Sequence, residues 1–247
     1  MKLVKFVVHS ARKRVGRVYR VPERGGAVIA LVGPDGAGKS TLVSHIVESL
    51  SGAVGVQATH LGKPTIFGLR AFRDHSSPGN LEARRPRRLP WISHLLSLAL
   101  ALGRLRAASS AVKDAKRGQV VIADRWPRVS PDGVDGPKTH LLSSAPPSPL
   151  ERVVATVEQR IYAAMPPVNL AIQIRVDSKI AEQRNRLRRV PDSTSDVRAR
   201  SRIDYRVGLN ADEVYEFNND LDAATATMHL LQVISSFLNR RTVATSV

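Results

Sequence analysis

The chain has 247 residues, 43% of them hydrophobic, which is enough to bury one substantial core and fits a single α/β domain. The absence of cysteine excludes disulfide bonds, thiolate nucleophiles and the usual zinc-ribbon ligand sets. A formal net charge of +17 predicts a surface that attracts anions, whether nucleotides, nucleic acid or acidic lipid head groups.

Residues 1–25 are predicted to form a basic arm before the folded domain. Lysines and arginines in this segment accompany a single acid, Glu23, and the segment ends at a pair of glycines. We expect a mobile tail, with docking on an acidic partner or a membrane surface as the alternative. Lys5 interrupts the apolar run Leu3–Val8 and no cleavage site follows, so no signal peptide is predicted and a cytoplasmic location is expected.

The first half of the folded domain, which we place at residues 26–247, is predicted to alternate strands and helices. In chain order the patterns predict a strand over 27–32, a helix over 39–50, a strand over 54–60, mainly loop over 62–90 and a helix over 91–116. Ala27–Val32 is an unbroken apolar run, which is typical of a parallel strand covered on both faces. The apolar run Leu95–Leu102 is too short to span a membrane and predicts a buried helical segment.

The second half continues the alternation. In chain order we expect a strand over 119–123, a proline-rich loop over 127–149, a helix over 150–164, a strand over 169–176, a helix over 177–189, an arginine-rich segment to about 202, a short helix through Tyr205, a strand over 213–218 and a helix over 221–239. This order predicts a three-layer α/β/α fold around a central parallel sheet, with ligands bound at the carboxyl ends of the strands.

The segment Gly33–Thr41, GPDGAGKST, gives the most specific signal in the sequence. It matches the P-loop pattern Gly-x4-Gly-Lys-Ser/Thr and lies between a buried strand and an amphipathic helix, as that loop requires. Glycines let backbone N–H groups approach phosphate oxygens, and the positive end of the helix adds to the anion site. Lys39 is expected to bridge the β- and γ-phosphates of ATP, and Ser40 to hold Mg²⁺. All positions of the segment are predicted to bind ATP: Gly33, Pro34, Asp35, Gly36, Ala37, Gly38, Lys39, Ser40 and Thr41.

Two further groups of charged residues are candidates for the same chemistry. Asp124 follows the strand over 119–123, where such sites place a second acidic group for the metal, and Arg125 comes directly after it. An ordinary surface ion pair is the alternative for these two. The arginine-rich residues 184–202 predict a lid, in which Arg184 and Arg188 share one helix face and are expected to neutralise charge on the transferred phosphoryl group. A solvated basic helix is the better account for at least half of the arginines in this segment.

Taken together, these motifs resemble those of thymidylate kinases and thymidylate-kinase-like relatives among the nucleoside-monophosphate kinases. The resemblance rests on GPDGAGKST, on the triplet Asp124-Arg125-Trp126 after the strand VVIAD, on the strand after Pro167, which leads into the lid, and on the final strand and helix. It covers about residues 27–238. It implies a P-loop NTPase fold with an arginine-rich lid, ATP and Mg²⁺ as cofactors, and phosphoryl transfer to a nucleoside monophosphate, dTMP first. It also leans towards a homodimer.

The resemblance also implies roles for matched residues. Asp35 is expected to face the acceptor sugar, Arg125 to contact the phosphates of acceptor and donor, and Asp124 to serve the metal. Gly36 stands where some family members carry an arginine, so the catalytic arginine is expected from the lid. Arg104 or Arg106, on the long helix before Gly118, matches the acceptor-binding arginine of the family.

The sequence departs from the family pattern in two loops. His60-Leu-Gly-Lys-Pro64 replaces an Arg-Glu-Pro-Gly type loop, which leaves Lys63 as the candidate cation for the acceptor. Residues 130–138, SPDGVDGPK, replace the pattern that helps to hold thymine. Both departures bear on which acceptor is used.

Three alternatives to a dTMP kinase remain open. The first is a related enzyme that acts on another phosphorylated or sugar acceptor. The two altered loops favour this alternative about as strongly as the motifs favour dTMP. The second is a basic nucleic-acid-binding P-loop protein, although an aromatic content of 4% argues against base stacking. The third is a catalytically silent nucleotide-binding scaffold. The histidines are scattered without ligand spacing, so none is assigned a metal or base role, and no clear nucleic-acid or membrane partner is indicated.

Overall fold

A computed structural model gives the structure of the protein. It describes residues 3–10, 13–22, 26–52, 54–62, 90–130, 134–139, 146–187 and 193–244.

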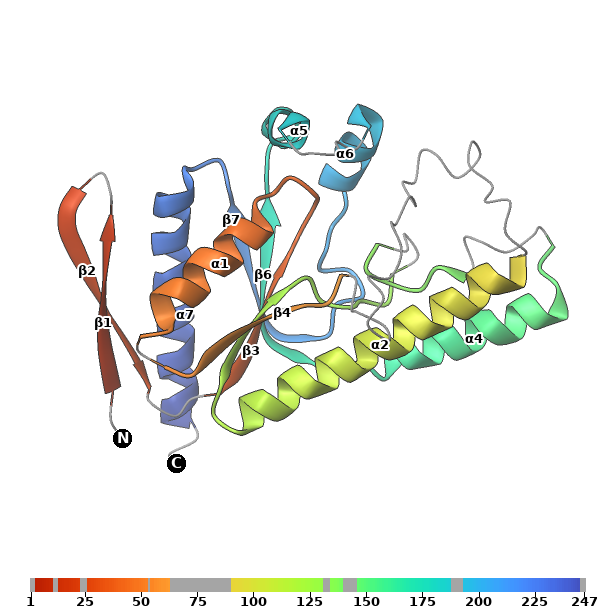
Figure 1. Ribbon diagram of the computed structural model, residues 1–247, viewed down its shortest axis with the longest axis horizontal. Coiled ribbons are helices and arrows are strands. Elements are labelled where there is room, and N and C mark those ends of the chain that lie inside the picture. Colours follow the sequence, from red (N-terminus) through yellow and green to blue (C-terminus); the bar gives the residue numbers. More distant parts are fainter. Residues whose placement is uncertain are drawn as a thin grey trace.

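A five-stranded parallel sheet forms the centre of the molecule (Figure 1). Its strands stand in the order β4-β5-β3-β6-β7, and every neighbouring pair is parallel. Their bounds are β3 Ala27–Val32, β4 Val56–His60, β5 Val120–Asp124, β6 Val168–Arg175 and β7 Ala211–Asn218. Because β5 and β6 flank β3, the loop that follows β3 lies at the middle of the carboxyl edge. The predicted α/β/α class is confirmed.

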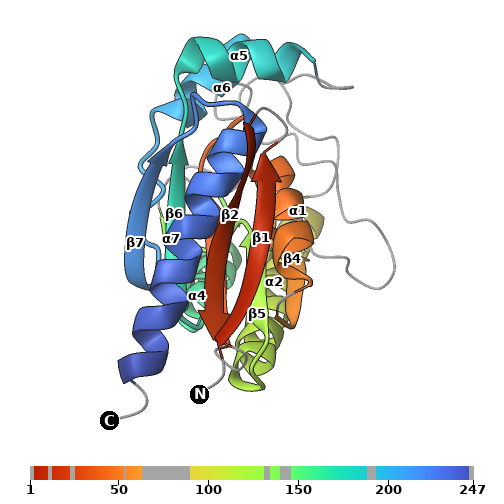
Figure 2. The same ribbon diagram turned by 90° about the vertical axis from the view of Figure 1, so that its left-hand side faces the viewer.

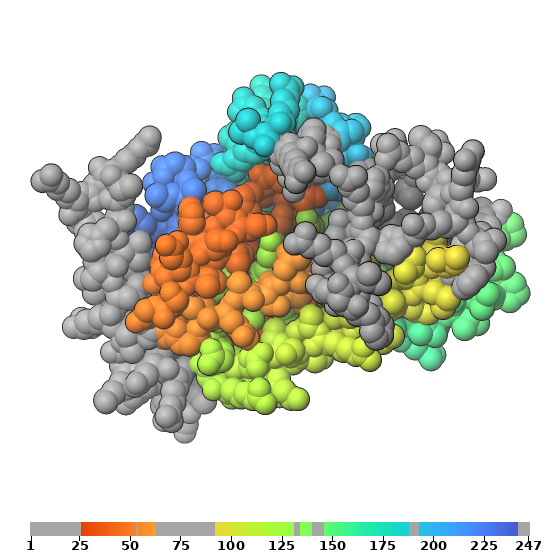
Figure 3. Space-filling view, viewed as in Figure 1, coloured from red at the N-terminus to blue at the C-terminus, as the bar shows by residue number. Residues whose placement is uncertain are grey.

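Helices cover both faces of the sheet and stand above its carboxyl edge. Helices α1 and α7 cover one face, and α2 and α4 lie side by side on the other (Figure 1). Helices α5 and α6 stand above the end of α1 that carries the P-loop (Figures 1 and 3). The helix bounds are α1 Lys39–Leu50, α2 Pro90–Lys116, α4 Pro149–Ala163, α5 Ser178–Arg186, α6 Thr194–Ser201 and α7 Ala223–Ala244.

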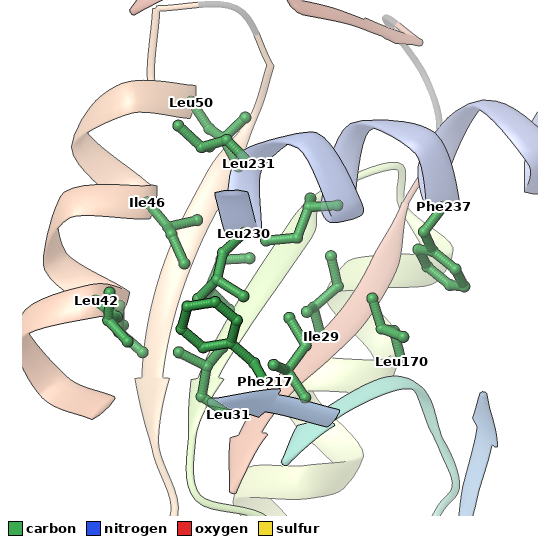
Figure 4. Packing of buried hydrophobic residues seen from close by; sticks show 14 of the residues in the cluster. Ile29, Leu31, Leu42, Ile46, Leu50, Leu170, Phe217, Leu230, Leu231 and Phe237 are labelled. Carbon is green, nitrogen blue, oxygen red and sulfur yellow. The ribbon is translucent and has the colours of Figure 1, made fainter. Parts of the chain in front are cut away.

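The strand β3 is apolar throughout because both of its faces are covered. Ile29 and Leu31 point to the core under α1 and α7, where they meet Leu42 and Leu230 (Figure 4). Residues 28, 30 and 32 point to the second core, under α2 and α4. Side chains alternate between the faces of a strand, so a strand buried on both faces shows an unbroken apolar run.

The N-terminal arm contains a β-hairpin, which replaces the predicted mobile tail. Strands β1 (Leu3–Ser10) and β2 (Lys13–Pro22) pair antiparallel, with a register irregularity between His9 and Ser10. The hairpin lies beside α7 (Figure 2).

Other predictions on the elements need correction. The arginine-rich segment contains the helix α6, which was not predicted, and the expected helix through Tyr205 is a turn. The run Leu95–Leu102 is not fully buried, because the side chains of Leu95 and Leu102 are 54% and 42% exposed. By length and composition alone, Ile92–Lys116 is the one helix of the described residues that is apolar enough to cross a membrane. Its inner face packs on β3, β5 and α4.

Candidate active site

The P-loop follows β3 and turns into α1 through backbone that only glycine adopts easily. A Cβ on Gly33 would stand 2.4 Å from the carbonyl oxygen of Ile174. Gly38 has φ +80°, in the left-handed region, and caps the first turn of α1. The loop therefore folds tightly against β6, and the first N–H groups of α1, which have no acceptor within the helix, form its positive end at the loop.

Lys39 lies buried at the start of α1. Its Nζ donates a hydrogen bond to the carbonyl oxygen of Pro34 at 2.6 Å. Burial, with Arg125 nearby, lowers the pKa of the Lys39 ammonium to about 8 against the opposing effects of Asp35 and Asp124. A buried ammonium that donates to a carbonyl oxygen of the P-loop fits the phosphate-binding role that the sequence predicts.

Ser40 and Asp124 meet across the loop, as the predicted metal ligands should. Ser40 Oγ donates to Asp124 Oδ2 at 2.6 Å, and His60 Nδ1 lies 3.2 Å from the same oxygen. The strand register sets this meeting, because Asp124 is paired with Leu31 of β3 on one side and with His60 of β4 on the other. Burial alone would raise the pKa of Asp124. Hydrogen bonds from His60 and Ser40 outweigh that effect, so the pKa lies below its usual value.

The donor set at Asp124 fits Mg²⁺. Asp124 Oδ1 is buried and has no hydrogen-bond partner in the described part of the chain, while a serine hydroxyl stands next to the carboxylate. Mg²⁺ prefers hard oxygen ligands and usually takes one or two from the protein and the rest from phosphate and water. The described residues hold no cluster of three or more His, Asp or Glu side chains that would suit a metal bound by protein alone.

Arg125 occupies the space between two carboxylates. Its backbone has φ +72°, and its N–H donates to the carbonyl oxygen of Leu31 at 3.0 Å. Nη1 donates to both oxygens of Asp135 at 3.2 Å, and Nη2 donates to Asp35 in the P-loop. Asp35 also accepts a hydrogen bond from Arg200 of α6. Asp135 is the leading cause of a raised pKa of the Arg125 guanidinium.

The Arg104 side chain is buried behind Arg125 and Asp135 and does not reach the surface of the site. It is 2% exposed, and its donors bond the carbonyl oxygens of Leu61 and Gly62 and the hydroxyl of Tyr162, at 2.6 to 3.1 Å. Its Nη2 lies 3.7 Å from Asp135. We call the connected side chains Arg104, Arg125, Arg200, Asp35 and Asp135 the arginine–carboxylate network. Arg104 therefore reaches the site through Asp135, whereas the family resemblance implies a direct contact with the acceptor.

Of the two predicted lid arginines, the structure describes one. Arg184 on α5 approaches the P-loop: its Nη1 stands 3.9 Å from the place a Cβ on Gly38 would take, and is buried without a hydrogen-bond partner among the described residues. Arg188 lies outside the described residues, as does Lys63.

The structure brings to the site four residues that are not among those predicted from the sequence. Asp135 and Arg200 belong to the network, His60 lies at Asp124, and Asn219 holds the P-loop. The Nδ2 of Asn219 donates to the carbonyl oxygen of Ala37 at 2.7 Å. For Arg200, the predicted arginine-rich lid was the only available signal.

The comparisons with known proteins add a likeness of fold. No family model matches the chain, and no curated protein matches it. Two solved structures of deoxyadenosine kinase from M. mycoides resemble it, one with bound dATP and one with the products dCMP and a flexible dCDP. Each is 16% identical with a TM-score of 0.49; the matches cover 84% and 85% of this chain and 98% and 99% of those chains. A likeness at this level does not decide substrate or reaction, so the functional assignment rests on the geometry of the site.

Proposed function

We propose that the protein is an ATP- and Mg²⁺-dependent phosphotransferase of the nucleotide-kinase type. The observation that carries the proposal is the meeting of three groups at the carboxyl ends of β3 and β5. These are the buried Lys39 in a complete P-loop, the Ser40–Asp124 pair at 2.6 Å, and Arg125 next to that pair. Phosphoryl transfer needs little covalent chemistry from the protein, and positioned charges of this kind supply most of the catalysis.

Each residue has a defined task in this mechanism. The P-loop N–H groups and Lys39 hold the β- and γ-phosphates, while Ser40 and Asp124 hold the metal. Bound Mg²⁺ neutralises charge on the phosphate oxygens. Arg184 lies on the lid helix α5, and Arg125 lies beside Asp35 and Asp135, which we call the acceptor side. Both arginines stabilise the charge that develops on the transferred group.

The acceptor is a nucleoside-type compound that meets Asp35 and Arg125. The family resemblance favours dTMP, and a sugar or another phosphorylated compound is the alternative. Asp35 belongs to the P-loop yet contacts Arg125 and Arg200, so it joins the donor site to the network. Its carboxylate suits a sugar hydroxyl, which is a hydrogen-bond donor.

We further propose a cytoplasmic homodimer that forms through α2 and α4. The supporting observation is the exposure of large apolar side chains on these neighbouring helices, above all Leu95 at 54%, Leu150 at 62% and Val153 at 59%. Large apolar side chains that stay exposed on neighbouring helices favour burial against a partner. Light scattering after size exclusion is expected to give twice the monomer mass, and Leu95→Glu with Val153→Glu is expected to halve it; a monomeric wild type would contradict the dimer.

Transfer from γ-labelled ATP to a panel of nucleosides, nucleoside monophosphates and sugar phosphates tests the proposed reaction. We expect Mg²⁺-dependent labelling of at least one acceptor by the wild type, and loss of labelling in Lys39→Ala. Absence of ATP binding would overturn the proposal. ATP binding without transfer to any acceptor would leave a nucleotide-binding scaffold instead.

A further inference from the structure

Two residues at the acceptor side have an unusual backbone. Among the described residues, Arg125 with φ +72° and Asp135 with φ +55° are the non-glycine residues with positive φ. Side chains rarely adopt this region, and where they do the surrounding structure holds them there, often at a functional site. The two residues also bond each other, since Arg125 Nη1 donates to both carboxylate oxygens of Asp135.

Hydrogen bonds of Arg128 hold the turn that contains Asp135 in place. The backbone N–H of Arg128 donates to the carbonyl oxygen of Asp135 at 3.1 Å. Its guanidinium, which is 1% exposed, donates to the carbonyl oxygens of Val134, Asp204 and Val207 at 3.0 to 3.2 Å. This side chain ties the turn at Asp135 to the chain after α6, so the Asp135 carboxylate has little freedom to move.

The two carboxylates of the network offset part of the positive charge of its three arginines. Asp135 lies 3.2 Å from Arg125 and 3.7 Å from Arg104, and Asp35 bonds both Arg125 and Arg200. Burial alone would raise the pKa of Asp135. The charges of Arg125 and Arg104 outweigh that effect and lower the pKa, so this carboxyl stays ionised at neutral pH. Two fixed negative charges therefore flank the guanidinium that an acceptor would meet.

We propose that Asp135 is a specificity-determining residue that makes the site prefer a neutral, hydroxyl-bearing acceptor, a nucleoside or a related polyol, over its monophosphate. This inference rests on the proposed kinase function. In the proposed mechanism Arg125 acts on the transferred phosphoryl group, so a second phosphate, on the acceptor, would approach that anion together with Asp35 and Asp135, and such like-charge contacts discriminate strongly between ligands. A neutral hydroxyl can donate to a carboxylate and accept from the guanidinium. By this inference dTMP is a poorer acceptor than its nucleoside.

The step that follows is a direct displacement. The acceptor hydroxyl oxygen forms a bond to the γ-phosphorus, and the bond from that phosphorus to the β–γ bridging oxygen breaks. ADP leaves with the electron pair of the broken bond, and the hydroxyl proton passes to solvent. The products are ADP and the phosphate monoester of the acceptor.

The test compares each of several 2′-deoxynucleosides with its own 5′-monophosphate at saturating MgATP. We expect the wild-type kcat/KM to favour the nucleoside by at least about tenfold, a low bound for a like-charge contact in a buried site. Asp135→Asn keeps the side-chain shape and tolerates positive φ, so it should fold, and we expect it to lower the preference by about tenfold. The control Asp212→Asn removes a remote carboxylate that lies 3.5 Å from Arg241, and it should leave the preference unchanged.

The possible outcomes separate the two proposals. A wild type that prefers the monophosphate overturns the inference and leaves the kinase assignment intact, and this measurement needs no variant to fold. A loss of activity in Asp135→Asn that is equal for both acceptors means a structural role and also overturns the inference. Failure of the wild type to transfer phosphate to either class would overturn the proposed function itself, and the inference with it.

Discussion

The donor side and the acceptor side of the site treat charge in opposite ways. On the donor side two polar atoms, Arg184 Nη1 and Asp124 Oδ1, are buried without a hydrogen-bond partner among the described residues. On the acceptor side, Arg125 and Arg104 are each paired with the Asp135 carboxylate. Buried polar groups are normally satisfied, so unsatisfied groups indicate where charge is to arrive. The comparison teaches that, among the described residues, the donor side leaves a guanidinium and a carboxylate open for a phosphate and its metal, whereas the acceptor side holds its guanidinium groups on a carboxylate.

The largest expected effect is that of removing Lys39. Lys39→Ala should lower kcat/KM at least about 10²-fold, because it deletes a preorganised cation that faces developing negative charge. Steady-state transfer from labelled ATP measures this. Lys113→Ala, at the exposed end of α2, provides the matched control and should keep wild-type activity.

Loss of the metal-binding carboxylate should come next. Asp124→Asn should raise the Mg²⁺ concentration for half-maximal activity about 10- to 100-fold, the range found when groups that support a metal site are changed. The control Asp114→Asn changes a carboxylate that bonds Gln57 and lies beyond the opposite end of β5. An unchanged Mg²⁺ midpoint in Asp124→Asn would remove Asp124 from the metal site.

Arg184 should make a smaller contribution from the lid. Arg184→Ala should lower kcat about tenfold with a lesser change in KM, since its Nη1, which has no hydrogen-bond partner among the described residues, is placed to act on the charge of the transition state. Arg186→Ala on the exposed side of α5 is the control. Equal effects of the two substitutions would assign both arginines to general surface charge.

The smallest effect is expected at the support of the P-loop. Asn219→Ala removes the 2.7 Å hydrogen bond to Ala37 O, and a net value of about 1 kcal/mol for such a bond corresponds to an ATP Kd raised about fivefold. Calorimetric titration with ATP measures the change. Asn210→Ala, at an exposed position before β7, should leave the Kd unchanged.

The donor side could be predicted from the sequence because its signals are local. Nine consecutive residues, Gly33–Thr41, carry the loop, and the apolar strand before Asp124 places that carboxylate at the same edge. The start of α4 is also predictable from the sequence, since Ser148 and Glu151 form a capping box and Pro149 stands at the first helical position.

The acceptor side could not be predicted, because its determinants are distant in sequence or lack a pattern. Asp135 meets Arg104 only through packing of a loop against α2, and although the Asp135-Gly136 pair is typical of a turn with positive φ, it does not indicate which residues the carboxylate contacts. Arg200 reaches Asp35 across 165 positions. The helix α6 was missed because its polar composition hides the periodicity of a buried face, although Ser193 caps its first turn.

The most direct test of the central claim is γ-phosphoryl transfer by the purified protein with MgATP and a panel of nucleosides and nucleoside monophosphates. The account predicts labelled product with the wild type, and none with Lys39→Ala or when EDTA removes the metal. ATP-dependent labelling that survives Lys39→Ala, or ATP binding with no transfer to any acceptor, would contradict it.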